Sequence, residues 1–424
     1  MPCRTINLRA KSDRRFIRSA YRSNRFVLAE LTAPHMHTDA NAPQRKRPPV
    51  NLAFVLDRSG SMAGQKIALA KQAVEQSIAR LQADDRFAVV VYDDQIDVVI
   101  RSTLASSEAK RDALALLSRI EARNATNLGE GWLRGAEQVA QDLMPEGINR
   151  VLLLTDGLAN KGITSRDELA RHASELRTRG VQTTTFGVGT DFDEVLLTAM
   201  SNAGGGNFYY IADGRQIVDY ITSEVGEALD VVARDVTLNV VTPRGVTVES
   251  LSPFPFSSSV PGRTAVSIGS LVAEQVVQVV LRLNFPLGEL GRDTGAVLSV
   301  GEDASASLSW TYADDDLNDA QERDAEVDRA VASLFAGRAR QEATALNRAG
   351  DYRAAQAALA SVARRIGSYA GRDKEMRALI AQLEQDSMVL TAPMAELSRK
   401  EMYFRQYASM KSRDLEGRAQ RRKP

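Results

Sequence analysis

Three oxygen-bearing side chains follow one apolar run at alternate positions. The run 54–56 is Phe-Val-Leu, and Asp57, Ser59 and Ser61 come directly after it. Alternate residues of a turn can point to the same side, so a carboxylate and two hydroxyls can face one point. Hard divalent cations prefer oxygen ligands of this kind. The spacing therefore predicts a cation site in the turn that follows the first buried strand.

Two more segments bring oxygen atoms to the same edge of the expected sheet. Thr155-Asp156-Gly157 ends the apolar run 151–154 and adds a second carboxylate. The loop 124–129, Asn-Ala-Thr-Asn-Leu-Gly, precedes an expected helix and offers the hydroxyl of Thr126. In open α/β sheets, ligands bind at the carboxyl ends of the strands, near a switch in strand order. We therefore expect Thr126 and Asp156 near the Asp-x-Ser-x-Ser turn.

Helix capping is a competing interpretation of the same turn. Ser59 or Ser61 could cap the helix that follows, and for the motif in isolation the two interpretations are about equal. The presence of Thr126 and Asp156 in the expected order favours the cation site, although the two roles can coexist.

Catalytic motifs are incomplete in this sequence. A haloacid-dehalogenase-type phosphatase needs a second aspartate where Ser59 stands, and the P-loop-like spacing 157–162 is followed by Ile163 rather than lysine. His172 is the one histidine of the α/β region, and it gives no sign of a triad. We expect no enzyme, with no catalytic residue and no organic cofactor. Metal-assisted phosphoester hydrolysis through Asp57 and Asp156 is the remaining catalytic alternative.

Two other groups of polar residues have more ordinary explanations. Asp93 and Asp94 follow a strand and are better explained as a solvated hairpin turn than as cation ligands. His35 and His37 lie in a Pro- and Asn-rich linker, where a His-x-His pattern arises by chance.

The region from about Pro49 to Asp230 alternates strand-like runs with amphipathic helical segments. This alternation predicts an α/β fold with a doubly wound, mostly parallel sheet covered by helices on both faces. The expected strands are 50–56, 87–92, 98–101, 151–155, 182–188 and 207–211. The expected helices are 66–81, 108–120, 128–143, 165–179, 194–200 and 214–229. The loop 93–97 is too short for a crossover and predicts an antiparallel hairpin at one edge.

The flanking segments have a different pattern. Short alternating runs with turns between residues 231 and 315 predict an antiparallel β-sandwich, and we expect the strand-like run 25–32 to pair with them. The α/β domain, residues 49–230, would then be inserted into a sandwich built from residues 1–48 and 231–315. Residues 316–398 have helical periodicity, and residues 399–424 predict a basic, partly disordered tail.

Composition excludes several classes of protein. The 54 basic and 54 acidic side chains balance, so the net charge gives no general attraction to nucleic acid or to an anionic membrane. The single cysteine, Cys3, cannot close an internal disulfide, which favours a reducing compartment. No apolar run approaches the roughly 18 residues that a membrane-spanning helix needs, and the basic N-terminus lacks the apolar stretch of a secretory signal. These features predict a cytoplasmic protein.

The three polar segments together resemble a von Willebrand factor type A (VWA) domain with a metal-ion-dependent adhesion site, over about residues 49–230. The resemblance implies a Rossmann-like fold and a divalent cation, with Mg²⁺ expected and Mn²⁺ or Ca²⁺ as alternatives. It implies that Asp57, Ser59 and Ser61 are direct ligands, that Thr126 is the loop ligand, and that Asp156 acts directly or through water. The layout is similar to bacterial stand-alone VWA proteins and, more loosely, to inter-alpha-trypsin inhibitor heavy chains.

The resemblance also implies a function. A divalent cation held by one or two carboxylates and several hydroxyls keeps residual positive charge. A Glu or Asp side chain of a protein partner can then complete its shell. We expect a non-enzymatic, metal-dependent interaction module that binds such a partner. The alternative implied by the family is an adaptor subunit of an AAA-plus ATPase that works in assembly or metal insertion.

Overall fold

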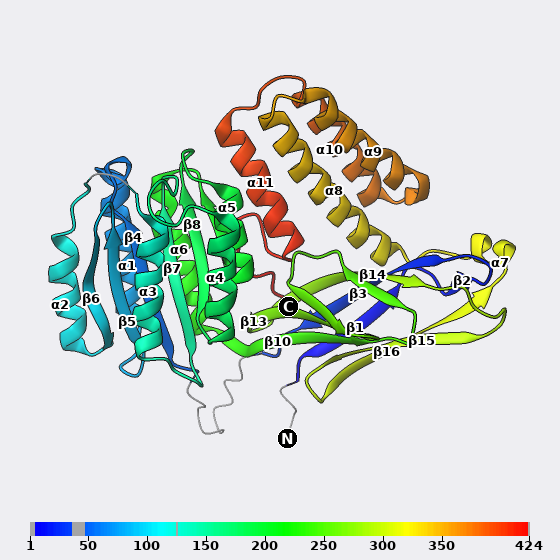
Figure 1. The fold of residues 1–424 in the computed structure, drawn as a ribbon, viewed down its shortest axis with the longest axis horizontal. Helices are drawn as coiled ribbons and strands as arrows, with labels where there is room; N and C mark the ends of the chain where they lie inside the picture. The colour runs from blue at the N-terminus through cyan, green and yellow to red at the C-terminus, as the bar shows by residue number, and fades with distance from the viewer. Residues whose placement is uncertain (1–4, 36–46, 124–125, 423–424) are drawn as a thin grey trace. The chain divides into compact units, whose positions relative to one another are not determined.

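The computed structural model describes residues 5–35, 47–123 and 126–422. The chain forms two compact units. Of the described residues, one unit contains those within 47–231 and 416–418, and the other contains 5–35, 232–415 and 419–422. The chain therefore leaves one unit, builds the other and returns, as expected for an inserted α/β domain. Figure 1 shows the elements of both units.

The inserted unit is built on a six-stranded sheet with the order β6-β5-β4-β7-β8-β9. The strands are β4 (Val50–Asp57), β5 (Arg86–Tyr92), β6 (Ile96–Leu104), β7 (Ile148–Thr155), β8 (Gln182–Val188) and β9 (Gly205–Ile211). All pairs are parallel except β5 with β6, which is antiparallel. The predicted edge hairpin is thus confirmed. β4 and β7 are buried along their whole length, which explains their continuous apolar sequences.

Helices cover both faces of this sheet (Figure 1). They are α1 (Gln65–Arg80), α2 (Ser107–Ser118), α3 (Leu128–Gln141), α4 (Arg166–Thr178), α5 (Glu194–Ala203) and α6 (Ile217–Leu229). Each lies within a few residues of the range expected from sequence. The doubly wound architecture follows, because parallel strands need crossover connections and the helices supply them.

The second unit contains the two sheets of a β-sandwich. One sheet has the order β1-β3-β14-β11, and the other has the order β12-β13-β10-β15-β16-β2. The strands are β1 (Asn7–Ser12), β2 (Phe16–Arg18), β3 (Ser23–Thr32), β10 (Val231–Val241), β11 (Thr247–Ser250), β12 (Phe256–Val260), β13 (Arg263–Val272), β14 (Val276–Phe285), β15 (Asp293–Val300) and β16 (Ala304–Ala313). β3 pairs with β14 over its full length, so the predicted pairing of 25–32 with later strands is confirmed.

The sandwich core is drawn from both sheets. Alternate apolar residues of β3 and β14 meet those of β10 and β15. The buried rings of Trp310 and Phe285 contact each other in a tilted arrangement, with 5.0 Å between their centroids and 56° between their planes. One pair departs from the expected antiparallel pattern, since β2 is parallel to β16. This short edge strand pairs at Phe16–Arg18 only, and its connection to β16 runs through all the intervening elements, which leaves the chain free to return in the parallel direction.

Helices complete the second unit. They are α7 (Asp315–Ala320), α8 (Ala325–Arg348), α9 (Tyr352–Ala370), α10 (Lys374–Val389) and α11 (Glu396–Met410). Helix α11 corrects the prediction of a tail that starts at residue 399. Its Phe404, Tyr407 and Met410 are buried, and this apolar anchor outweighs the charge of the segment. Across the described residues, no helix is long and apolar enough to cross a membrane.

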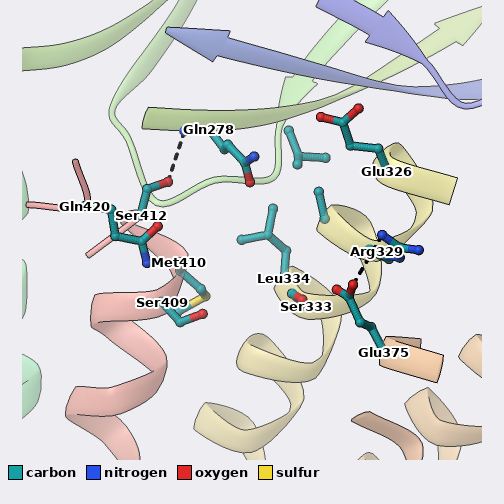
Figure 2. Close-up of a pocket in the computed structure, with 12 residues that line it drawn as sticks. Gln278, Glu326, Arg329, Ser333, Leu334, Glu375, Ser409, Met410, Ser412 and Gln420 are labelled. Atoms are coloured by element: carbon teal, nitrogen blue, oxygen red, sulfur yellow. Dashed lines mark hydrogen bonds and ion pairs between the residues drawn. The ribbon is translucent and has the colours of Figure 1, made fainter. Parts of the chain in front are cut away.

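A hollow of about 320 Å³ lies where β14, α8 and α11 approach one another (Figure 2). Several polar groups that line it have hydrogen-bond or ion-pair partners, and Glu326 pairs with Lys11 of β1. The backbone N–H of Gln278 donates to Oγ of Ser412 at 3.0 Å, and Arg329 lies 3.3 Å from Glu375. Since these groups already have protein partners, we assign no chemistry to this hollow.

Candidate functional site

The site lies at the switch point of the inserted sheet. β4 is the first strand in the chain order of this sheet, and its neighbours are β5 on one side and β7 on the other. The carboxyl ends of β4 and β7 therefore flank the crevice where ligands bind in open α/β sheets. Leu56 pairs with Leu154, so the next residues, Asp57 and Thr155, lie side by side.

Asp57 is buried and held by two donors. The hydroxyl of Thr155 donates to its Oδ2 at 2.7 Å, and the backbone N–H of Ser59 donates to its Oδ1 at 2.8 Å. Its side chain is enclosed, with 0% of the residue exposed. Burial raises the pKa of Asp57, and the charge of Asp156 raises it further, although hydrogen bonds from Ser59 and Thr155 act in the opposite direction. A cation beside this carboxylate would favour its charged form.

Hydroxyls link this turn to the second carboxylate. Oγ of Ser59 lies 3.1 Å from Oγ of Ser61, and the Ser61 hydroxyl donates to Oδ1 of Asp156 at 2.6 Å. Ser59 and Asp156 are buried, whereas Ser61 is exposed. The structure therefore brings together four of the five residues expected from sequence, and the oxygen cluster reaches solvent through Ser61.

Thr126 lies beside the loop of the second carboxylate. Its Oγ1 is 3.3 Å from the position that a Cβ atom on Gly157 would occupy, and Thr126 is buried. The backbone N–H of Asn127 donates to the carbonyl of Asp93 at 2.8 Å and so ties this loop to the end of β5. Asn124 and Ala125, the start of the same predicted loop, lie outside the described residues.

The turn does not use its serine side chains as helix caps. A short 3₁₀ helix, Gly60–Met62, follows Ser59, and the Ser59 side chain makes no capping hydrogen bond. Helix α1 begins after Gly64, whose φ of +77° favours glycine. The capping interpretation is therefore wrong, and the hydroxyls of Ser59 and Ser61 face each other and Asp156 instead.

Helix α3 packs closely beneath the site. A Cβ atom on Gly131 would lie 2.5 Å from the ring of Tyr92, and one on Gly135 would lie 2.2 Å from Val55. These glycines let the helix approach β4 and β5. Tyr92 is fully buried, its hydroxyl donates to the carbonyl of Leu154 at 3.2 Å, and burial raises its pKa well above the usual value.

A cluster of four charged side chains holds the turn after β4 in place. Sequence reasoning did not predict these ion pairs. Asp93 is buried between Arg58 and Arg123, whose Nε atoms lie 3.1 and 2.9 Å from its Oδ2. Both arginines also contact Asp97. Asp93 is therefore not a solvated turn residue. Burial raises the pKa of Asp93, but the backbone N–H of Gln95 and the two arginines outweigh it, so the pKa is lowered overall.

Lys66 is a second residue that sequence reasoning missed. Its Nζ lies 2.5 Å from Oδ2 of Asp156. The sequence did contain a signal for it. A lysine in the first turn of a helix is unfavourable, because its positive charge opposes the helix dipole. Lys66 lies in the first turn of α1, which has no acidic residue there.

The donor set fits a hard divalent cation. Two carboxylates and the hydroxyls of Ser59, Ser61 and Thr126 supply only oxygen atoms. In the described part of the chain, no three His, Cys, Asp or Glu side chains are grouped to hold a metal, so any cation at this site depends on the hydroxyls.

The described histidines lie elsewhere and give no support for hydrolysis at this site. His172 is on α4 beside Glu168 and Glu175, at 3.8 and 3.9 Å. His35 pairs with Glu274 in the sandwich unit, and His37 lies outside the described residues.

Comparison with known proteins identifies the family of the inserted unit. The model of the von Willebrand factor type A domain matches residues 51–223. The Escherichia coli protein YfbK is 30% identical over 206 residues, which is 47% of this chain and 36% of YfbK. Human inter-alpha-trypsin inhibitor heavy chain H1 is 31% identical over 188 residues, which is 42% of this chain and 21% of that protein. The chain thus spans about a third or less of these curated relatives.

A solved structure shares the fold of the whole chain. The von Willebrand factor type A protein from Catenulispora acidiphila superposes with a TM-score of 0.72 and covers 96% of this chain and 97% of its own, at 18% sequence identity. The similarity therefore extends beyond the inserted unit to the sandwich and the C-terminal helices.

Proposed function

Because residues 51–223 form a von Willebrand factor type A domain, a domain that commonly mediates protein–protein interaction, we propose that this chain is a non-enzymatic module that binds an acidic protein partner through a divalent cation. One observation carries this proposal. Asp57, Ser59, Ser61 and Asp156 form a connected cluster of oxygen donors at the sheet's switch point, with Ser61 open to solvent.

The residues have distinct roles in the proposal. Asp57 provides the buried carboxylate, and Thr155 and Ser59 N–H orient its two oxygens. Ser59, Ser61 and Thr126 supply neutral oxygens, and Lys66 compensates the charge of Asp156. While that pair persists, Asp57 is the one uncompensated carboxylate among these donors, so a charge of +2 is not cancelled. A bound Mg²⁺ would supply the electrostatic attraction for a Glu or Asp side chain of the partner, with Mn²⁺ or Ca²⁺ as alternatives.

The proposed cellular location and the proposed absence of catalysis rest on other features of the chain. One cysteine in 424 residues allows no internal disulfide, and on that basis we propose the cytoplasm. The hydroxyls near Asp57 lack a neighbouring histidine among the described residues, which supports binding rather than hydrolysis.

The first test measures metal binding directly. Asp57→Asn keeps the shape of the side chain and removes its charge. Because burial disfavours that charge, we expect the variant to stay folded without metal while it loses the rise in melting temperature that Mg²⁺ gives the wild type. At a metal concentration of 100 times the dissociation constant, the wild type should gain about 2.7 kcal/mol. Asp94→Asn, at the same edge with a half-exposed side chain, is the control and should behave as the wild type.

The second test measures partner binding. Proteins captured from native lysate in Mg²⁺ are compared with those captured in chelator, and each is compared with capture by Asp57→Asn. The proposal requires a partner that is lost under both conditions and that loses affinity when one of its own surface Glu or Asp residues is changed to Ala. A partner that binds equally well in chelator and to Asp57→Asn would show that the interaction does not use this site.

A further inference from the structure

The amine of Lys66 already acts as a cation within the candidate site. Nζ lies 2.5 Å from Oδ2 of Asp156, while the Ser61 hydroxyl donates to Oδ1 of the same carboxylate. The Asp156 side chain is fully buried, and the Lys66 side chain is 35% exposed. Both oxygens of Asp156 therefore have a donor, and its negative charge is compensated without any metal.

The position of Lys66 is unfavourable for its own helix. It is the second residue of α1, where the unpaired backbone N–H groups give the helix end a partial positive charge. A lysine at this position destabilises the helix, typically by a few tenths of a kcal/mol to about 1 kcal/mol. The first turn of α1 has no acidic residue to offset this cost. Residues that are unfavourable for their own helix or strand often lie at functional sites. Here the ion pair with Asp156 offsets the unfavourable position of Lys66.

The neighbourhood keeps the lysine close to the site. Cγ of Lys66 lies 3.4 Å from the position that a Cβ on Gly214 would occupy, and Nζ lies 3.9 Å from that on Gly189. A side chain at either position would meet the lysine. The stem therefore lies beside the loop that follows β9, and the amine lies beside the loop that follows β8 and against Asp156.

We propose that Lys66 is a resident cation that sets the metal affinity of this site. In the metal-free protein its amine neutralises the buried carboxylate of Asp156. A divalent cation that binds between Asp57 and Asp156 must share Asp156 with this amine or displace it, and the two positive charges repel each other. Lys66 therefore keeps metal binding weaker than the oxygen ligands alone would make it, and it stabilises the metal-free state. This inference rests on the proposed cation site.

The experiment compares three variants of the full chain. Lys66→Met keeps most of the stem and removes the charge, Lys66→Arg keeps the charge, and Lys71→Met removes a charge from the same helix. Lys71 serves as the control because its amine bonds to the carbonyls of Ser118 and Ile120 rather than to Asp156. The dissociation constants of Mg²⁺ and Mn²⁺ are measured by calorimetric titration, and melting temperatures are measured with metal and with chelator.

Lys66→Met should lower the stability of the metal-free protein and raise its affinity for metal. Without metal, Lys66→Met should melt below the wild type, because a buried carboxylate loses its counter-charge. With metal, its dissociation constant should fall about tenfold, since the repulsion between like charges is gone. Its gain in melting temperature on adding metal should therefore exceed that of the wild type. Lys66→Arg and Lys71→Met should keep wild-type affinity. If Lys66→Met does not fold, Lys66→Gln provides the same comparison.

The outcomes separate this inference from the proposed function. If the wild type binds metal and Lys66→Met binds it with equal or lower affinity, Lys66 is only a structural ion pair and the inference is overturned, while the cation site stands. If neither protein binds metal, both ideas fail. If Lys66→Met binds more tightly but the double variant with Asp57→Asn binds just as well, the cation lies elsewhere. That result would overturn both proposals for this site.

Discussion

The hydroxyl of Thr155 donates a hydrogen bond of 2.7 Å to Oδ2 of Asp57, which joins the ends of two strands that are 98 residues apart in the chain. Both residues are fully buried. The bond orients a carboxylate whose charge is costly in this environment, and it leaves the hydroxyls of the following turn to face Asp156. Thr155 therefore positions Asp57 in the proposed site.

Replacing Thr155 tests this role. Thr155→Val keeps the shape of the side chain and removes the donor, so the free energy of unfolding should fall by about 1 to 3 kcal/mol. Metal affinity should fall as well, because Asp57 is no longer held in place. Denaturant unfolding in chelator measures the first effect, and metal titration measures the second. Thr155→Ser keeps the hydroxyl and should retain metal affinity. A Ser variant that loses as much affinity as Val would mean that the methyl group, rather than the bond, matters.

Asp93 should matter more than its partner Asp97, although both contact Arg58 and Arg123. Asp93 is fully buried, whereas the side chain of Asp97 is 52% exposed. Asp93→Ala leaves the buried Arg58 with one exposed partner, and we expect a loss of roughly 2 kcal/mol in stability. Asp97→Ala should cost less than about 1 kcal/mol. Equal losses in urea unfolding would show that the cluster acts as a surface network.

Glu224 anchors helix α6 to the sheet beneath it. Its carboxylate accepts bonds from Arg150 at 2.6 Å, Thr184 at 2.8 Å and Tyr209 at 2.6 Å, and it is fully buried. Glu224→Gln leaves the buried Arg150 without its counter-charge and should lower the free energy of unfolding by about 3 kcal/mol.

Asp219→Asn is the matched control on the same helix, because Asp219 is exposed, and it should change stability by less than about 0.5 kcal/mol. Amide hydrogen exchange should accelerate in α6 of Glu224→Gln first. Protection that is lost uniformly across the sheet would argue against a specific anchor.

Tyr369 should make the protein sensitive to alkaline pH. Burial, followed by the charge of Asp328, raises the pKa of Tyr369 to about 12, and Arg323 stacks on its ring at 4.8 Å. The folded state holds this proton more tightly than the unfolded state, whose pKa is about 10. The stabilisation is therefore present below pH 10 and is lost as the pH rises from 10 towards 12.

The loss should be about 1 kcal/mol after allowance for partial exposure of the ring. Urea unfolding gives the free energy of unfolding of the wild type and of Tyr369→Phe at pH 9 and at pH 11. The loss is the change, between the two pH values, in the difference between the two proteins. The Phe variant should be no less stable than the wild type at pH 9, because the buried Tyr369 hydroxyl has no hydrogen-bond partner among the described residues. A parallel loss in both proteins would assign the pH effect to other groups.

Sequence reasoning succeeded where local pattern and sheet geometry decide the outcome. β4 and β7 are continuous apolar runs, and a carboxylate follows each run or ends it, so Asp57 and Asp156 had to meet at one edge if the strands were neighbours and parallel. The hairpin 93–97 was predictable because five residues cannot form a crossover. The pairing of 25–32 with later strands followed from patterns on both sides of the inserted unit, and the structure identifies β14 as a partner.

Two of the errors, the tail expected from residue 399 and the solvated turn at Asp93, share one cause, which is charge. The segment 396–410 is rich in Arg, Lys and Glu, and its charges obscured the apolar positions Phe404 and Tyr407 that bury α11. Asp93 was expected in solvent because it sits in a short turn, but arginines from two other loops enclose it. The sequence pattern does not show which distant residue a charged side chain will pair with.

The sequence alone determined the order of the strands and helices of the inserted unit along the chain and the end of the sheet at which the oxygen donors of the proposed site gather. These features depend on periodicity and on residues adjacent in the chain. Only the tertiary structure decided which donor each carboxylate oxygen accepts from, so that Thr155 holds Asp57 and Lys66 neutralises Asp156. The physical reason is that burial of apolar strands is encoded by local composition, whereas the partner of a buried charge is set by distances between segments far apart in the chain.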